Sequence, residues 1–461
     1  MERRLRSAWQ GWAVALAGAV ALPGCNAVRW DTSWPAPRPL GADLATYRPP
    51  REPTANPASA AAFEEPTGIL ELRQAQRHAL LGNPRLTAHS WEVRAHEART
   101  LQAALPPNPE LTVDLEDVLG SGDYHGIDQA QTTITLSQDL EIGGKRRKRH
   151  HMADLEEDVA GWDYEAVRLD VLTQTTQAFT AVLAGQKRLA LDEDLVAIAR
   201  EAFNLVVTEI DEGKARPIER TRAKIAVSSA ELKRDRTRAA LQTARSNLAA
   251  QWGSEQETFS EVAGDLEAVR EPPTLESMFA RMDRNPAIAR WHTEVERLRA
   301  ALAVEQAERI PTVNVGAGYR HHTPMHDDAA VFGVGVPLPL VDRNQGGILE
   351  ATYNLRKAEV EERAARLKIR TKLAAADDRL RESFAEVNSL RGDVLPDAEA
   401  VYRQLIEDFD AGKGPYDDLL DAQRVHFTLR EQYVQALENY HVAAADVARL
   451  IGGPLWEAVT P

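Results

Sequence analysis

The feature that most constrains this chain is an internal duplication. An Asn-Pro pair begins at Asn83 and recurs at Asn285, which is 202 residues later. Two glycines that interrupt long helical patterns, Gly213 and Gly412, are 199 residues apart. Chance does not keep such offsets nearly constant, so the sequence predicts two copies of one structural unit. Each copy should therefore adopt the same order of helices and strands.

Each copy follows the order helix, strand, strand, very long helix, glycine break, return helix. In the first copy we expect a helix at about 68–104, strands near 110–118 and 131–140, and helices at about 146–212 and 217–252. In the second copy we expect a helix at about 274–307, strands at 311–319 and 331–338, and helices at about 345–411 and 416–451. The longest helices would measure roughly 100 Å at 1.5 Å per residue. Pro396 predicts a kink or a seam within its helix.

The four expected strands alternate between apolar and polar or small residues. The apolar positions are Leu111, Val113 and Leu115, then Ile134 and Leu136, then Val313, Val315, Ala317 and Tyr319, and finally Phe332, Val334 and Val336. Such a face meets a core in a soluble sheet and lipid in an outer-membrane barrel, and alternation alone does not distinguish them. Four strands cannot close a membrane barrel, and unpaired edges are not tolerated in lipid. A spanning sheet would therefore need further chains, and three chains would supply twelve strands.

The amino terminus has the pattern of an export signal. Basic residues precede an apolar run from about Trp12 to Leu22, which is too short to span a bilayer comfortably. The run ends in LPGC, similar to a bacterial lipobox, and its Cys25 is the only cysteine. We expect residues 1–24 to be removed and Cys25 to be acylated, although an ordinary signal with an incidental cysteine is the alternative. Residues 25–67, rich in proline, would form a lipid-anchored tether.

Net charge limits the class of partner. The formal charge of −15 argues against nucleic acid, whose phosphates need a basic surface, and is compatible with cations or soluble solutes. The nucleotide-binding pattern GxxxxGK[ST] and the zinc-protease pattern HExxH are both absent from the sequence.

Several segments resemble one known family. They are LLGNPRL (80–86), PNPELTVDLEDV (107–118), LSQDLEIGGKR (136–146), VPLPLVDRNQGG (336–347) and AGKGPYDDLLDAQ (411–423). With them the chain resembles the outer-membrane efflux protein family typified by TolC, over about residues 68–452. NPELTVDLEDV and LEIGGKR are most similar to its heavy-metal-cation branch, whose members are called CzcC-like.

The resemblance implies a mainly α fold with a small β membrane part, in two repeats at 68–260 and 261–461. A homotrimer would form a 12-stranded β-barrel in the outer membrane of a Gram-negative bacterium, surrounded by outer-membrane lipid. A long periplasmic α-helical barrel would continue it, and would dock a periplasmic adaptor (membrane fusion) protein and, through it, an inner-membrane resistance-nodulation-division pump. The chain would be a conduit, neither an enzyme nor dependent on a cofactor.

The implied function is the exit duct of a tripartite efflux system for heavy-metal cations. One alternative is the same channel serving drugs or other small solutes. Another, of a different class, is a periplasmic adaptor or coiled-coil scaffold lipoprotein. An adaptor should have one hairpin between small β-domains, and a pure scaffold should lack the paired strands.

The glycine breaks would then be the hairpin ends at the periplasmic mouth. We expect the adaptor to contact Gly213, Lys214, Gly412, Lys413 and Gly414. Asp418 and Asp421 share a helix face and align with the gate aspartates of the family, and Glu219 is the first-copy equivalent of Asp418. In a trimer they would form pore-lining rings that attract cations. The simpler interpretation is that acids favour the start of a helix. Gly414 stands where some family members carry a gate arginine.

Two other clusters are weaker candidates. His321, His322 and His326 fall between the third and fourth expected strands and could bind a transition metal, although a polar surface loop is the simpler interpretation. The basic run 145–151 follows the second strand. It is either a solvated face or a contact with anionic lipid.

Overall fold

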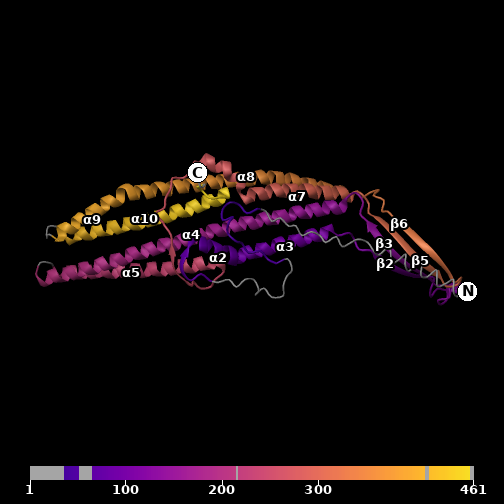
Figure 1. Ribbon diagram of the computed structural model, residues 1–461, viewed down its shortest axis with the longest axis horizontal. Coiled ribbons are helices and arrows are strands. Elements are labelled where there is room, and N and C mark those ends of the chain that lie inside the picture. The colour runs from indigo at the N-terminus through magenta and orange to yellow at the C-terminus, as the bar shows by residue number, and fades with distance from the viewer. Residues whose placement is uncertain (1–35, 51–64, 214–215, 411–414, 457–461) are drawn as a thin grey trace. The chain divides into compact units, whose positions relative to one another are not determined.

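Long helices without interior breaks make up most of the structure. The computed structural model describes residues 36–50, 65–213, 216–410 and 415–456, all within one unit, Pro35–Pro461 (Figure 1). The main helices are α2 (Leu72–Gly82), α3 (Pro84–Ala104), α4 (Lys145–Asp211), α5 (Pro217–Ala249), α6 (Leu275–Arg281), α7 (Pro286–Glu308), α8 (Gln345–Ser389), α9 (Leu395–Asp410) and α10 (Tyr416–Ile451). No helix in these ranges is both long and apolar enough to cross a lipid bilayer.

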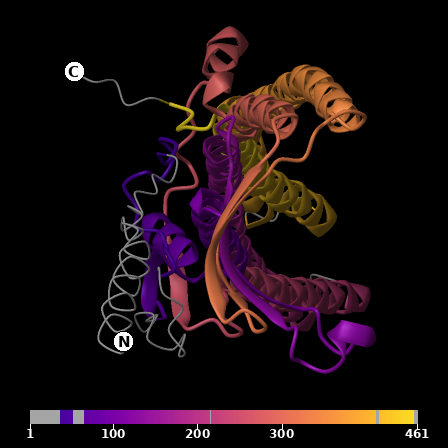
Figure 2. The ribbon, with the colours of Figure 1, turned by 90° about the vertical axis from the view of Figure 1, so that its right-hand side faces the viewer.

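The strands form two sheets. The larger contains β2 (Glu110–Glu116), β3 (Gln131–Leu140), β5 (Val313–His322) and β6 (Asp327–Gly335), and the smaller contains β1 (Gly68–Glu71) and β4 (Phe259–Ala263). The larger sheet is antiparallel in the order β2-β3-β5-β6, so the two repeats join where β3 pairs with β5. Its strands bend as one curved sheet in the end-on view of Figure 2. Strands β2 and β6 are its two edges within the chain.

The duplication is visible in equivalent hydrogen bonds. Asn83 precedes α3, and its side-chain oxygen accepts from the amides of the next turn at 3.0 and 3.2 Å. Its amide nitrogen donates to the carbonyl of Gln251, at 2.7 Å. Asn285 does the same before α7, accepting from Ala287 and donating to Leu450 at 2.9 Å each. The Asn-Pro landmarks are therefore buried helix caps that tie each first helix to the end of its return helix.

Heptad-spaced side chains build the largest core. Leu373, Leu380 and Val387 of α8 are each seven residues apart and all are fully buried. They pack with α10 residues that include Leu437 and Tyr440. A seven-residue spacing keeps one seam of a long helix facing its partner. This seam holds the second hairpin together above the glycine break.

Several boundaries differ from the sequence prediction. The segment expected to be one helix at 68–104 begins as β1, which pairs in parallel with β4, and then breaks at Asn83. The expected helix at 274–307 is likewise interrupted, by a 3₁₀ turn at Met282–Arg284. The fourth strand occupies Asp327–Gly335 rather than 331–338. Prolines and short strand pairings between distant segments account for these differences.

The interruption expected near Pro396 is present as a π-helical turn. Helix α8 passes through Leu390–Val394 into α9, and the amide of Leu395 donates to the carbonyl of Leu390, five residues earlier. Because Pro396 lacks an amide hydrogen, the regular bonding pattern cannot continue through it. The wider turn accommodates that loss without ending the helix.

Part of the predicted tether is docked rather than free. Arg168 of α4 is 1% exposed and donates two 2.7 Å hydrogen bonds to Glu165. It also donates to the carbonyls of Arg38 and Leu40, at 3.0 Å each. A buried guanidinium has more donors than one carboxylate can satisfy, so it needs these carbonyls. Residues 36–50 therefore lie against the helices, which corrects the expectation of a tether throughout 25–67. Cys25 falls outside the described residues.

Candidate functional site

The first hairpin ends at a glycine in the left-handed region. Helix α4 ends at Asp211, and Gly213 has φ +75°. Helix α5 begins with Pro217, which has no amide hydrogen to leave unsatisfied in a first turn. The expected hairpin between 212 and 217 is therefore confirmed. Of the residues expected to contact an adaptor, Lys214, Gly412, Lys413 and Gly414 lie outside the described residues.

One arginine connects the two hairpins near their ends. Arg222 of α5 donates to both carboxylate oxygens of Asp417 in α10, at 2.9 and 3.1 Å. It also approaches Glu219 at 3.5 Å, and Arg216 donates to Glu219 at 2.7 Å. Glu219 is 8% exposed. Its carboxylate is thus enclosed by two guanidinium groups and is not a free acid within the chain.

The other two predicted gate acids lie apart from Glu219. Asp418 and Asp421 are exposed on α10. Asp421 pairs with Arg424 of its own helix, at 2.6 Å. The amide of Asp418 donates to the carbonyl of Pro415, as expected in a first helical turn. The structure therefore groups Glu219 with Asp417 and leaves Asp418 and Asp421 exposed at the surface of the chain, with Asp421 paired only to Arg424 of its own helix.

Sequence reasoning missed the arginines of this cluster. Arg216 and Arg222 flank Glu219 at three residues on either side, which is the spacing that brings side chains together on a helix. That spacing was a local signal for Arg222–Glu219. The contact between Arg222 and Asp417 joins residues 195 apart, and no local pattern indicates it.

The strand pairing places the alternating apolar residues on one face. Val113 pairs with Ile134, and Val315 pairs with Val334. Ile134 also pairs with Tyr319, which lies four residues from Val315 on the same strand. Side chains separated by an even number of residues share a face. The predicted grouping of these four residues is therefore confirmed.

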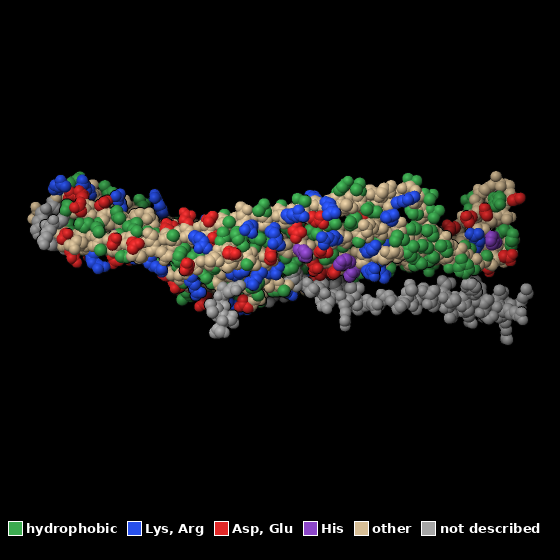
Figure 3. All heavy atoms as spheres, turned by 90° about the horizontal axis from the view of Figure 1, so that it is seen from above, with side chains coloured by type: hydrophobic (Ala, Val, Ile, Leu, Met, Phe, Trp, Pro, Cys, Tyr) green, Lys and Arg blue, Asp and Glu red, His purple; other side chains and the backbone are tan. Residues whose placement is uncertain are grey.

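That face is exposed in the single chain. Leu111, Val113, Phe332 and Val334 are all among its exposed large hydrophobic side chains. Figure 3 shows hydrophobic side chains gathered where the helices meet the strands. An apolar sheet face of this extent indicates contact with lipid or another chain rather than with water.

The candidate histidines do not converge. His321 and His322 belong to β5, not to a loop as expected, and successive strand residues point to opposite faces. His321 lies 2.8 Å from Asp328 of β6, whereas His326 occupies the turn with φ +53°. Among the described residues no group of three or more His, Cys, Asp or Glu side chains is arranged to hold a metal ion.

In the basic run after β3, some residues form ion pairs and others are exposed. Lys145 is 4% exposed, and its Nζ lies 2.8 Å from Glu308. Arg149 donates to Glu141 at 2.9 Å. These pairs fix the start of α4 against the end of α7 and against the end of β3. Arg146 and Arg147 are exposed and have no ion pair within the described part of the chain.

An acidic patch on α4 has an altered proton affinity. Burial raises the pKa of Glu157 to about 7, and the neighbouring charge of Glu97 adds to the effect. Burial also raises the pKa of Asp158, with a contribution from the charge of Asp154. Charged forms are disfavoured where water is excluded and like charges are close. This part of α4 is therefore less acidic at neutral pH than its sequence suggests.

Comparison with known proteins identifies the family. The profile of outer membrane efflux proteins matches residues 76–254 and 281–453, which are the two repeats. The chain belongs to the outer membrane efflux protein family. This membership confirms the resemblance drawn from the sequence segments.

Relatives of known role are similar over most of this efflux protein. The cobalt-zinc-cadmium resistance protein CzcC of Cupriavidus metallidurans is 32% identical over 388 residues, covering 84% of this chain and 91% of that protein. The nickel-cobalt-cadmium resistance protein NccC of Alcaligenes xylosoxydans is 25% identical over 324 residues, covering 68% and 73%. The expected heavy-metal branch is thus supported by relatives named for metal resistance.

Solved structures share the fold of this efflux protein. CusC has a TM-score of 0.71 at 14% identity and covers 89% of this chain and 99% of that one. The outer membrane protein VceC of Vibrio cholerae has a TM-score of 0.69 at 17% identity, covering 84% and 97%. The fold is therefore that of outer-membrane efflux channels, as the sequence predicted.

Proposed function

We propose that this protein is the outer-membrane exit duct of a tripartite resistance-nodulation-division efflux system that exports heavy-metal cations. The observation that carries the proposal is its similarity, over 84% of this chain and 91% of the other, to a cobalt-zinc-cadmium resistance protein. The exposed acids Asp418 and Asp421 near the hairpin end are consistent with a path for cations.

The sheet supports assembly from three chains. Its order leaves β2 and β6 without partners on one side, and unpaired backbone groups are costly in lipid. Pairing β6 of one chain with β2 of the next would close twelve strands around an axis. The apolar face would then contact outer-membrane lipid, and the helices would extend into the periplasm, where the hairpin ends meet the adaptor. Acylated Cys25 would add an anchor in the membrane.

Metal tolerance of cells tests this function. The gene is deleted in a host that carries the matching pump and adaptor, and tolerance to cobalt, zinc and cadmium is measured with and without the gene restored. We expect tolerance to fall on deletion and to return with the gene. If only tolerance to organic cations such as ethidium changes, the duct serves drugs instead. If neither changes while the protein is in the outer membrane, the proposed function is wrong.

A further inference from the structure

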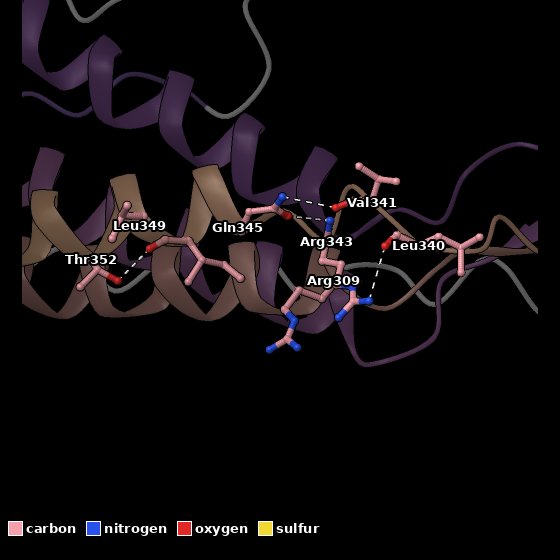
Figure 4. A pocket seen from close by; sticks show the side chains of 8 residues that line it. Arg309, Leu340, Val341, Arg343, Gln345, Leu349 and Thr352 are labelled. Carbon is pink, nitrogen blue, oxygen red and sulfur yellow. Dashed lines mark hydrogen bonds between the residues drawn. The ribbon is translucent and has the colours of Figure 1, made fainter.

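A hollow of ≈ 550 Å³ lies where β6 leads into α8, between the end of α7 and the start of α8. Arg309 contributes from just beyond α7, and Leu340, Val341 and Arg343 contribute from the segment before α8. Leu349 adds an apolar side chain from the first turns of α8. Figure 4 shows both arginine side chains extending toward the same side of this hollow.

The two guanidinium groups carry charge that the chain does not neutralise. Arg343 donates to the neutral carbonyls of Pro339 and Leu340, at 3.2 and 3.4 Å. Arg309 is exposed and has no ion pair within the described residues. Neutral carbonyls accept hydrogen bonds but leave the positive charge in place. Two such cations lining one hollow form a site for an anion in a chain whose net charge is −15.

Neighbouring acids bond to other residues. Glu308 holds the Nζ of Lys145 at 2.8 Å. Glu305 accepts from the side chain of Asn344, at 2.5 Å, and Asp342 accepts from the backbone amide of Asn344 at 2.9 Å. These contacts direct Glu308 to the start of α4 and Glu305 and Asp342 to Asn344 at the start of α8, and none of the three acids forms an ion pair with Arg309 or Arg343 within the described residues. Arg309 and Arg343 therefore have no carboxylate partner of their own, which leaves room for an anion from outside the chain.

Apart from Gln345 and Thr352, the rest of the hollow is lined by apolar side chains. Leu340 is 74% and Val341 86% exposed. Adjacent exposed apolar side chains of this kind differ from the single surface hydrophobics that are ordinary in proteins. They continue the line of exposed apolar side chains that runs along β6 and through Leu338. A soluble anion would satisfy the arginines and leave this surface in water. A molecule with a phosphate at one end and hydrocarbon at the other satisfies both halves.

We propose that this hollow binds one anionic glycerophospholipid of the periplasm-facing leaflet of the outer membrane. Its phosphate lies between Arg309 and Arg343, and its acyl chains lie against Leu340, Val341 and Leu349. Planar guanidinium groups match phosphate oxygens with paired, charge-assisted hydrogen bonds. A second copy of the chain is a less suitable occupant, because the hollow lies between two packed helices of one chain rather than along the free edge of β6. The inference rests on the proposed location in the outer membrane.

Native mass spectrometry of the purified full-length protein tests the proposal. The protein is delipidated and offered phosphatidylglycerol, the zwitterionic phosphatidylcholine, or inorganic phosphate. We expect phosphatidylglycerol to be retained in preference to phosphatidylcholine, and Arg309→Gln/Arg343→Gln to weaken retention by about tenfold. Leu340→Ser/Val341→Ser should also weaken it, with the charges intact. Arg356→Gln/Arg363→Gln is the matched control, because it removes two exposed charges farther along α8.

Three results would overturn the proposal. The first is equal retention of the two lipids. The second is displacement of phosphatidylglycerol by inorganic phosphate at similar concentration, which would indicate an anion site only. The third is protection of Arg309 and Arg343 from phenylglyoxal in the lipid-free assembly, which would place a second copy over the hollow. Lipid retention is measured on purified protein and metal tolerance on cells, so failure of the lipid site and failure of the efflux function are distinguishable.

Discussion

Arg222 of α5 and Asp417 of α10 form a two-point ion pair that joins the two hairpins of one chain, with nitrogen–oxygen distances of 2.9 and 3.1 Å. Both side chains are largely exposed, so the pair adds only about 0.5 kcal/mol to stability. The pair matters mainly because it connects the ends of two long hairpins, which lie far from the sheet.

Removing this ion pair should loosen the proposed periplasmic mouth. We expect Arg222→Ala to raise single-channel conductance in planar bilayers severalfold while changing thermal stability little. Arg403→Ala is the matched control, because Arg403 pairs with Glu399 within one helix, at 2.7 Å, and does not connect hairpins. Equal conductance of Arg222→Ala and the wild-type protein would show that the pair does not restrain the mouth.

The exposed acids of α10 should control ion selectivity. Asp418→Ala/Asp421→Ala removes up to six charges from a trimer, so cation selectivity and block by divalent or trivalent cations on the periplasmic side should both largely disappear. The measurement is bilayer conductance with a salt gradient. Glu382→Ala/Glu386→Ala, which removes two exposed acids of α8, should retain both properties. If the double aspartate variant still selects and blocks like wild type, these acids serve only to start a helix.

The shared face of the sheet should contact lipid. Spin labels at Val113, Ile134, Val315 and Val334 should report apolar surroundings in reconstituted protein. Labels at Asp114 and Thr135, which lie on the opposite face, should report water. Accessibility to oxygen and to a water-soluble nickel complex distinguishes the two environments. The reverse pattern would exclude a lipid-facing barrel.

The raised pKa of Glu157, to about 7, makes stability depend on pH. In the unfolded chain this carboxyl ionises near its ordinary value of 4.5, so the folded state holds an extra proton between 4.5 and 7. Stability should therefore fall as pH rises through that window. Glu157→Gln should stabilise the protein by about 1 kcal/mol at pH 8, allowing for partial solvent screening, and leave it unchanged at pH 4.

The unfolding midpoint, recorded at one scan rate across this pH range, measures the effect. Glu382→Gln, at an exposed position of α8, is the control and should show no such dependence. A difference between Glu157→Gln and wild type that is the same at pH 4 and pH 8 would contradict the assignment.

Cys25 should carry the lipid anchor. Mass spectrometry of the mature amino terminus should find a diacylglyceryl and an acyl group on Cys25, with residues 1–24 removed. Cys25→Ser should lose the modification and be released more readily from membranes, because several acyl chains bind far more firmly than none. A mature terminus elsewhere, or an unmodified Cys25, would rule this out.

The order of elements and most helix bounds could be predicted because they depend on local signals. Helix α10, for example, was expected at 416–451 and occupies Tyr416–Ile451. Its beginning follows a glycine-proline break and its end precedes Gly452, which has φ +65°. The four-residue strand β1 was missed, because its pairing with β4 involves residues about 190 apart and leaves no local periodicity.

The candidate site was only partly predictable for a similar reason. Sequence placed Glu219, Asp418 and Asp421 near the hairpin ends, but their partners depend on how two hairpins pack. The structure encloses Glu219 with Arg216 and Arg222 and leaves the two aspartates exposed. The placement of the histidines could not be predicted for a different reason. Antiparallel pairing extends β5 beyond its apolar residues, so His321 and His322 belong to the strand and point to opposite faces.

The duplication has a consequence for symmetry. Arg222 and Asp421 occupy equivalent positions, 199 residues apart, yet carry opposite charges. Six separate single repeats around an axis would repeat one side chain six times, so each ring would consist of like charges only. Fusing two repeats lowers six-fold symmetry to three-fold and lets the halves diverge. The first half has Arg222 where the second has Asp421, and Ile218 where the second has Asp417, so an arginine of one half meets an aspartate of the other.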